Sequence, residues 1–245
     1  MNIFFSILAF VGSVVVAQND TVKIKSHHQV DLTWYGDYDE KVLFPSEKSF
    51  EKILMDFTMG CASGGCSDWD YTVSVFLMNP TGSFDSTVTV LDTVRFEPLE
   101  IDTTWEVNES IEKFELARLI TPYGGYMDGY ISGDPNDLFD DSWMHSYVFD
   151  VTDFAPLLRD TSLIRVHYGG WSSGFSATLN FDFIEGTPPR EVLQIENMYP
   201  VDEYTYRSLA DDESFPAITK TFDESIRGVA LKSYISGHKH AGPEN

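Results

Sequence analysis

The sequence predicts an all-β protein, built as an antiparallel jelly roll or β-sandwich. Three observations support this prediction. Apolar and polar residues alternate over several runs, turn-forming residues interrupt these runs at short spacing, and few segments have the apolar spacing of an amphipathic helix. Hydrophobic residues make up 42% of the chain, which is enough to build a core.

The expected strands follow from the alternation, and the expected turns follow from glycine, proline and asparagine. One short helical turn is expected over residues 154–158, whereas residues 112–119 fit a helix or a strand. The alternating runs are residues 22–25, 29–32, 72–77, 87–90 and 176–183, and the turn signals are residues 79–82, 124–125, 169–170 and 186–189.

The chain is strongly acidic. Its 245 residues include 16 lysines and arginines against 39 aspartates and glutamates, which gives a net charge of -23 and a pI ≈ 4.3. A nucleic-acid backbone or an anionic membrane surface would repel such a protein. We therefore expect no nucleic-acid partner.

Residues 1–17 have the features of an export signal. Residues 3–16 are almost entirely apolar, and the small residues at 15–17 fit a signal-peptidase site. This run is too short for a comfortable transmembrane helix, and no later run approaches the roughly 18 apolar residues that a span requires. We expect a mature protein that begins at Gln18, has no membrane span and is secreted, periplasmic or exposed at the cell surface.

The two cysteines, Cys61 and Cys66, are separated by Ala-Ser-Gly-Gly. An exported protein meets an oxidising compartment, so a disulfide is the expected state of this pair. Because the closed loop is very short, its chain-entropy contribution is only about 2 kcal/mol. We expect the bond to fix local geometry rather than to hold the domain together.

The strand that follows the cysteines is expected to carry carboxylates on its polar face. The odd positions from Trp69 to Leu77 are apolar or aromatic, so Asp68 and Asp70 share the opposite face if the strand is regular. Two neighbouring carboxylates can divide the roles of general base and general acid. An ordinary polar strand face explains the same spacing.

A second strand repeats this arrangement. The odd positions from Phe175 to Phe183 are apolar, and Asp182 falls on the polar face. Trp171 follows two glycines at an expected strand end, where an indole can form a platform for a sugar ring or pack into the core. Asp182 and Trp171 are therefore candidates for a polar cleft, and a satisfied hydrogen-bond partner without a catalytic role explains Asp182 equally.

The segment Cys61-Ala-Ser-Gly-Gly-Cys66-Ser67-Asp68-Trp69-Asp70 resembles the signature of the bacterial peptide-N-glycosidase F family, in which a short disulfide loop leads into a Trp-Asp pair. Four further segments match in the order of the family. They are Ile120-Thr121-Pro122-Tyr123, Asp150-Val151-Thr152-Asp153-Phe154, Phe181-Asp182-Phe183 running into Gly186-Thr187-Pro188, and Ile235-Ser236-Gly237 continuing to His240-Ala241 and Pro243. The stretch from about Asn79 to Arg118 is longer than that family's and is expected to be an insertion.

The resemblance implies an amidase that hydrolyses the bond between an asparagine side chain and the first N-acetylglucosamine of an N-linked glycan, without a cofactor. Asp70 matches the base that activates water, with Asp68 as its partner. Trp69, Trp171 and Asp182 are expected to bind the substrate, an N-linked glycan or glycoprotein. The resemblance also implies a β-sandwich over residues 18–190 and the beginning of a second, incomplete β domain over residues 191–245.

Three departures from the family pattern leave a second function open. Gly169 stands where the family has a glutamate, and Asp68 stands where it has another glutamate. The chain also ends at Asn245, before the cysteine pair expected in the second domain, so we expect a truncated product or a protein with the first domain and only the beginning of the second. The alternative is a catalytically inactive glycan-binding or adhesin-like module on the same scaffold.

Metal binding is the weakest of the alternatives. His238 and His240 would share one face of a strand, and the fold of the family resembles that of copper monooxygenases, which use a His-x-His pair. A third ligand is not visible. The acidic stretch 128–141 supplies oxygen donors, but it lacks the spacing of a calcium-binding loop. We therefore predict no metal site, and a copper-monooxygenase-like protein is the remaining alternative function.

Overall fold

The computed structural model describes residues 20–67, 69–96, 99–123, 142–202, 204, 208–209 and 214–236. Asp68, the expected export signal, the acidic stretch 128–141 and the pair His238 and His240 lie outside these residues. Within the described part of the chain, no helix has the length and apolar composition that crossing a bilayer requires.

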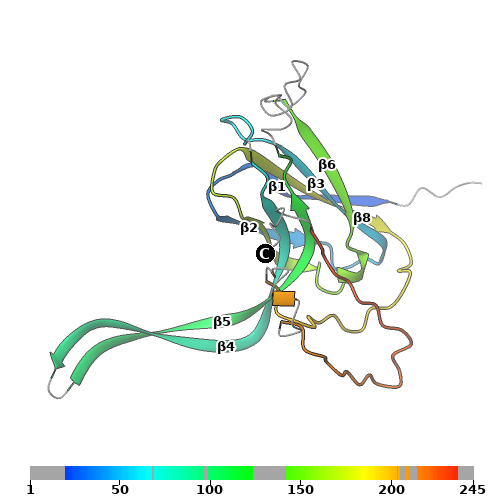
Figure 1. The fold of residues 1–245 in the computed structure, drawn as a ribbon. Coiled ribbons are helices and arrows are strands. Elements are labelled where there is room, and N and C mark those ends of the chain that lie inside the picture. Colours follow the sequence, from blue (N-terminus) through cyan, green and yellow to red (C-terminus); the bar gives the residue numbers. More distant parts are fainter. Residues whose placement is uncertain are drawn as a thin grey trace, which may run out of the picture.

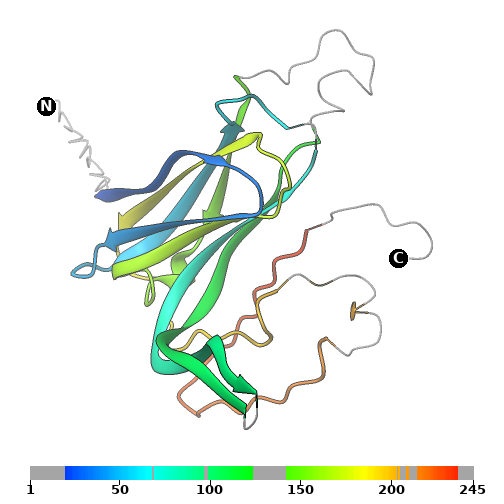
Figure 2. The ribbon, with the colours of Figure 1, turned by 90° about the vertical axis from the view of Figure 1, so that its left-hand side faces the viewer.

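The protein is a β-sandwich of two four-stranded antiparallel sheets, which confirms the predicted fold class (Figures 1 and 2). One sheet has the order β1-β8-β3-β6 and the other β2-β7-β4-β5, which is the strand order of a jelly roll. The strands are β1 (Thr21–Leu32), β2 (Gly36–Phe44), β3 (Phe50–Cys61), β4 (Thr72–Phe96), β5 (Leu99–Ile120), β6 (Met144–Asp150), β7 (Asp160–Tyr168) and β8 (Phe175–Glu185).

The core lies between the two sheets and follows the alternation that the sequence predicts. On β8 the five apolar positions from Phe175 to Phe183 are fully buried, whereas the positions between them are partly exposed. The facing positions on β4, Val73, Val75 and Leu77, are buried to the same degree. Because each strand has one face against the core, a shift by one residue would expose every apolar side chain.

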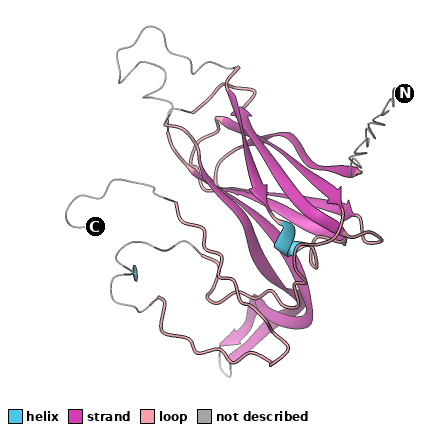
Figure 3. Ribbon diagram, turned by 90° about the vertical axis from the view of Figure 1, so that its right-hand side faces the viewer, coloured by secondary structure: helices cyan, strands magenta, loops and turns pink. Residues whose placement is uncertain are grey.

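A short 3₁₀ helix, η1 (Thr152–Phe154), connects β6 to β7 and appears beside the sheets in Figure 3. It begins two residues before the predicted helical turn. The ambiguous residues 112–119 belong to strand β5.

β4 and β5 continue beyond the sandwich as a two-stranded arm (Figure 1), formed by residues 80–96 and 99–111. The predicted turn at 79–82 is therefore wrong, because β4 runs through it. The register shifts between Pro80 and Phe84, and Gly82 has φ of 72°, a conformation that glycine adopts without strain. Such an irregularity lets a strand pass proline, which has no N–H to donate.

The described residues that follow β8 form no strand. They run past the base of the arm, where Asn197 donates a hydrogen bond to the carbonyl of Lys113 at 3.1 Å. Further on, the Tyr234 hydroxyl donates to the carbonyl of Leu116 on β5 at 2.7 Å. The domain boundary at residue 190 stays a prediction.

Candidate functional site

The candidate site begins with the disulfide loop at the end of β3. Cys61 and Cys66 form a disulfide, as predicted. Inside the loop, the Gly65 amide donates to the carbonyl of Ala62 at 2.9 Å, and Gly65 has φ of 97°, which favours glycine. The Ser63 amide donates to Asp31 on β1 at 3.1 Å. The loop is thus tied to the neighbouring strand and directs the chain toward Trp69 and Asp70.

A second loop, between β7 and β8, packs tightly against this segment. A side-chain carbon at Gly174 would lie 2.3 Å from the backbone nitrogen of Ser67, so only glycine fits there. The Ser67 hydroxyl accepts a hydrogen bond from the Trp69 amide at 3.2 Å and lies 3.2 Å from the hydroxyl of Ser172. The two loops therefore hold each other in place.

These loops bring together two of the predicted substrate-binding residues. The rings of Trp69 and Trp171 lie 6.4 Å apart, and the ring of Tyr123 lies 5.6 Å from that of Trp69. Trp69 is 50% exposed and Trp171 48% exposed. We call Trp69, Trp171 and Tyr123 the aromatic platform. Half-exposed aromatic rings that are fixed from behind offer a flat apolar surface to a ligand.

Tyr71 and Tyr168 support the platform from below. Tyr71 packs edge-to-face against Trp171 at 5.4 Å and against Tyr168 at 5.4 Å. The Tyr168 hydroxyl donates to the carbonyl of Ser172 at 2.8 Å. A tyrosine hydroxyl is protonated at neutral pH, and burial raises the pKa of Tyr168 further above its ordinary value. This contact orients the residue that follows Trp171.

Asp70 is partly buried and lies next to Trp69, two residues before β4 begins at Thr72. The predicted strand phase holds for Tyr71, which is 2% exposed, but not for Trp69. The loop contacts described above hold Trp69 outside the sheet, so strand alternation does not decide where Asp70 points. That Asp68 and Asp70 share the polar face of the strand stays a prediction.

Sequence reasoning missed a residue that fixes the backbone around Asp70. Thr121 is 1% exposed, and its hydroxyl accepts from the Tyr71 amide at 2.7 Å and donates to the carbonyl of Trp69 at 3.4 Å. The Thr121 amide donates to the carbonyl of Tyr71 at 2.8 Å. Thr121 lies in the Ile-Thr-Pro-Tyr segment, which was a usable signal for this role.

The structure does not bring Asp182 to the platform. Asp182 lies on β8, seven residues beyond Phe175, which corresponds to roughly 23 Å along the strand. Its carboxylate accepts a hydrogen bond from the ammonium group of Lys23 on β1 at 2.7 Å. This contact joins two strands on the outer face of the sheet.

Gly169 lies at the edge of the site, where its amide donates to the carbonyl of Thr72 at 2.9 Å. A side-chain carbon at this position would lie 3.4 Å from that carbonyl oxygen, which is an ordinary contact distance. A Cβ therefore fits at position 169 without a clash.

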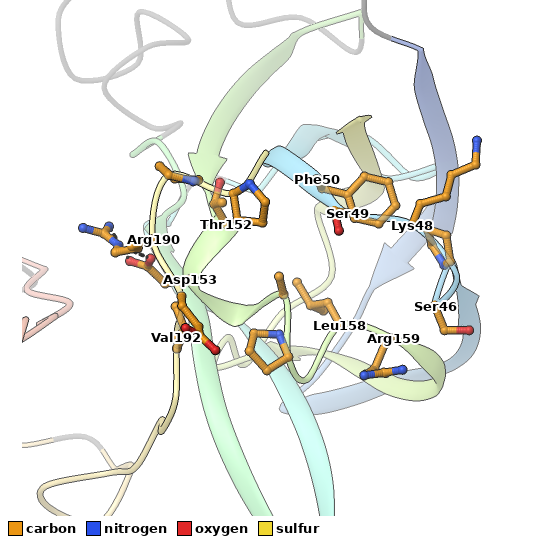
Figure 4. Close-up of a pocket in the computed structure, with 16 residues that line it drawn as sticks. Ser46, Lys48, Ser49, Phe50, Thr152, Asp153, Leu158, Arg159, Arg190 and Val192 are labelled. Carbon is orange, nitrogen blue, oxygen red and sulfur yellow. Dashed lines mark hydrogen bonds and ion pairs between the residues drawn. The ribbon is translucent and has the colours of Figure 1, made fainter. Parts of the chain in front are cut away.

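A cavity of about 370 Å³ lies at the opposite end of the sandwich, near Phe50 (Figure 4). Its lining does not include Asp70 or the aromatic platform. Three basic residues at this cavity form ion pairs with carboxylates: Lys48 with Glu185, Arg159 with Asp160, and Arg190 with Asp153. The contact between Arg190 and Asp153 is bidentate, with distances of 2.6 and 2.8 Å. These pairings fit a structural role.

Among the residues that the structure describes, no group of three or more histidines, cysteines and carboxylates is placed to hold a metal ion. The candidate ligands His238 and His240 lie outside the described residues, so the structure tests neither the expectation of no metal site nor the copper alternative.

The fold and the site define a jelly-roll domain in which a disulfide loop leads into a Trp-Asp pair beside an exposed aromatic platform. The family model for "Peptide-N-glycosidase F, N terminal" matches residues 13–183, well over half of the chain. The chain belongs to the peptide-N-glycosidase F family.

Several solved structures are similar to this chain. A structure of PNGF-II has a TM-score of 0.50 and 16% identity, covering 70% of this chain and 35% of its own. PNGase F, a glycosylasparaginase from Flavobacterium meningosepticum, has a TM-score of 0.45 and 22% identity, covering 70% of this chain and 44% of its own. The chain therefore spans less than half the length of these relatives. No curated protein sequence matches it.

Proposed function

We propose that this chain is an exported amidase of the peptide-N-glycosidase F type, which acts on N-linked glycoproteins. The observation that carries the proposal is the position of Asp70, beside an aromatic platform and behind a disulfide loop, in a member of the peptide-N-glycosidase F family. The expected export signal at residues 1–17 supports a secreted, periplasmic or surface location. We expect no cofactor.

The aromatic platform would hold the sugar next to the bond that is cleaved. The Tyr71 ring packs against Trp171, and the Ser67 hydroxyl, which lies 3.2 Å from the Ser172 hydroxyl, accepts a hydrogen bond from the Trp69 amide, so both rings are held in place. A rigid ring loses little conformational entropy when it binds the apolar face of a sugar. Asp182 lies too far along β8 to take part in this contact, and we leave it out of the proposed site.

Asp70 would act as the general base. Its carboxylate accepts a proton from water while the water oxygen attacks the carbonyl carbon of the glycosylated asparagine side chain. The tetrahedral oxyanion then collapses, and the C–N bond breaks. The amine leaves with the sugar as a glycosylamine, taking up a proton, and the asparagine becomes an aspartate. Thr121 is a positioning residue, because it fixes the backbone on both sides of Asp70.

The test is the conversion of asparagine to aspartate in a denatured N-glycoprotein, followed by mass spectrometry of its peptides. We expect conversion by the unmodified chain and a loss of about 10²–10⁴-fold in Asp70→Asn, the range that a general base contributes. Asp182→Asn is the matched control, because it makes the same change outside the site. Equal rates in Asp70→Asn and the unmodified chain would contradict the proposed role of Asp70.

A second candidate function is glycan binding without catalysis, and Gly169 is the observation that favours it. The resemblance places a glutamate at this position, and the absence of that carboxylate removes a polar group from the edge of the site. Retention on a column of immobilised N-glycoprotein without asparagine conversion would favour this function. Because a Cβ fits at position 169 without a clash, Gly169→Glu tests whether the missing carboxylate limits catalysis.

A further inference from the structure

The turn between β1 and β2 carries two large aromatic side chains into solvent. Trp34 is 66% exposed and Tyr35 is 56% exposed, and their rings meet edge-to-face at 5.7 Å. Neither residue packs into the core. Adjacent aromatic residues that are exposed together form an apolar surface, and such surfaces mark sites of interaction.

This turn has a defined structure. The Tyr38 hydroxyl accepts a hydrogen bond from the Thr33 amide at 2.5 Å and lies 2.9 Å from the Thr33 hydroxyl. The Tyr38 ring lies so close to Gly36 that a side-chain carbon there would meet it at 2.9 Å. Tyr35 has φ of 34°, a conformation that non-glycine residues adopt only when the surroundings hold them in it. The two aromatic side chains are thus held in place.

The turn is also joined to the candidate site. The Tyr35 amide donates a hydrogen bond to the carbonyl of Gly170 at 2.7 Å, and Gly170 directly precedes Trp171. A side-chain carbon at Gly170 would lie 2.4 Å from the ring of Tyr168, so glycine is required at this junction. Trp34 and Tyr35 therefore lie on the same end of the sandwich as the aromatic platform, next to Trp171.

We propose that Trp34 and Tyr35 form an outer sugar subsite, which stacks against a neutral pyranose of the glycan beyond the sugar held by the aromatic platform. This inference rests on the proposed function, since it takes the platform as the position of the first sugar. A neutral sugar suits a chain of net charge -23, which would repel an anionic polymer. An indole and a phenol ring offer flat apolar faces together with polar edges, as sugar recognition requires.

The experiment compares two glycopeptides with the same peptide sequence, one with a single N-acetylglucosamine and one with an extended neutral N-glycan. Binding is measured by calorimetry on the full chain in an Asp70→Asn background, which prevents cleavage. We expect Trp34→Ala to weaken binding of the extended glycopeptide about 5-fold, the scale of one aromatic contact, and to leave the single-sugar glycopeptide unchanged. Trp105→Ala is the matched control, because Trp105 is 65% exposed on the arm.

Each of the other outcomes contradicts either the outer subsite or the proposed function. If Trp34→Ala binds the extended glycopeptide as tightly as its parent, the outer subsite is wrong and the proposed function stands. If Trp34→Ala weakens both glycopeptides equally, the residue supports the platform rather than a separate sugar. If the parent binds neither glycopeptide, the proposed function fails together with the subsite. The circular dichroism of Trp34→Ala checks that its fold is intact, and an exposed side chain is expected to preserve it.

Discussion

Strands β4 and β5 form one long two-stranded ribbon, whose inner half lies in the sandwich and whose outer half is the arm. The two halves differ in the elements that cover their side chains. In the inner half, Val75 and Leu77 are fully buried in the core, and Phe76 on the opposite face is 6% exposed. In the outer half, the same alternation of apolar residues continues, but these side chains are exposed. Phe84, Val88, Trp105 and Val107 have exposed fractions of 68%, 42%, 65% and 65%.

The difference arises from neighbours rather than from composition. The inner half of β4 pairs with β7 as well as β5, and the second sheet covers its core face. Lys113 lies over the ring of Phe76 at 5.1 Å and shields the other face. Among the residues that the structure describes, the outer half of β4 pairs with β5 alone. Val88 is opposite Trp105 and Ser86 is opposite Val107, so the apolar residues share one face of the arm.

Alternation of apolar and polar residues predicts a strand, but it does not predict that the apolar side chains are buried. Alternation places apolar side chains on one face, whereas burial requires a second layer to cover that face. A two-stranded ribbon alone is marginally stable in water, so the inner half must contribute most of the stability.

The largest contrast is expected between two valines of the same ribbon. Val75→Ala should reduce the free energy of unfolding by about 2–3 kcal/mol, because it removes buried methyl groups and leaves a cavity. Val107→Ala should change it by less than about 0.5 kcal/mol, because the side chain is already 65% exposed. Urea denaturation measures both values. Similar losses in the two variants would mean that the face of the arm is covered in solution.

We expect the stability of the sandwich to depend on pH because of a buried histidine. His27 on β1 is 1% exposed, its Nε2–H donates to the carbonyl of Tyr38 at 3.0 Å, and its Nδ1 accepts from the Ser26 hydroxyl at 2.9 Å. Burial lowers the pKa of His27 below its ordinary value of 6.5. The neutral ring therefore stabilises the fold fully above pH 6.5, and this contribution falls as the pH drops from 6.5 through the folded-state pKa.

Chemical denaturation between pH 5 and pH 8 tests this prediction. His27→Gln should be less stable than its parent at neutral pH, by about 1–3 kcal/mol, and its stability should fall less between neutral and acidic pH. His145→Gln is the control, because His145 is exposed on β6. If His27→Gln keeps the full loss of stability at acidic pH, another group is responsible.

The sequence predicted those features that depend on local pattern. The buried face of β8 followed directly from alternation, and the disulfide followed from two cysteines in a short flexible loop. The exposed ring of Trp171 was one of two possibilities that the sequence left open. Its contact with Tyr71 depends on the close approach of two loops.

Contacts between distant segments could not be predicted from pattern. Thr121 fixes the backbone at Tyr71 from 50 residues away, and Ser172 meets the Tyr71 hydroxyl at 2.8 Å from 101 residues away. The prediction that Trp69 lies on the apolar face of the strand was wrong for the same reason, because loop contacts determine its position. The turn predicted near Pro80 was wrong because β4 continues past Pro80 and stays paired with β5.

The smallest effect is expected from removing the outer half of the ribbon altogether. Deletion of residues 83–108 would join Gly82 to Glu109 and leave Pro80 paired with Ile111, a contact already present at the base of the arm. The Thr81 hydroxyl would keep its hydrogen bond to the carbonyl of Ser110, which is 2.9 Å long. Gly82 already has a positive φ, so it suits the new turn.

We expect the deletion to shift the melting temperature by less than about 4 °C, because none of the removed side chains that the structure describes is buried in the core. Differential scanning calorimetry measures this shift, and Val75→Ala provides the scale of a core defect. Glycopeptide binding should be unchanged, because the deletion removes neither Trp34 nor the aromatic platform. A large drop in melting temperature would show that the arm folds as one cooperative unit with the sandwich. The exposed apolar face of the arm would then be covered by other contacts in solution.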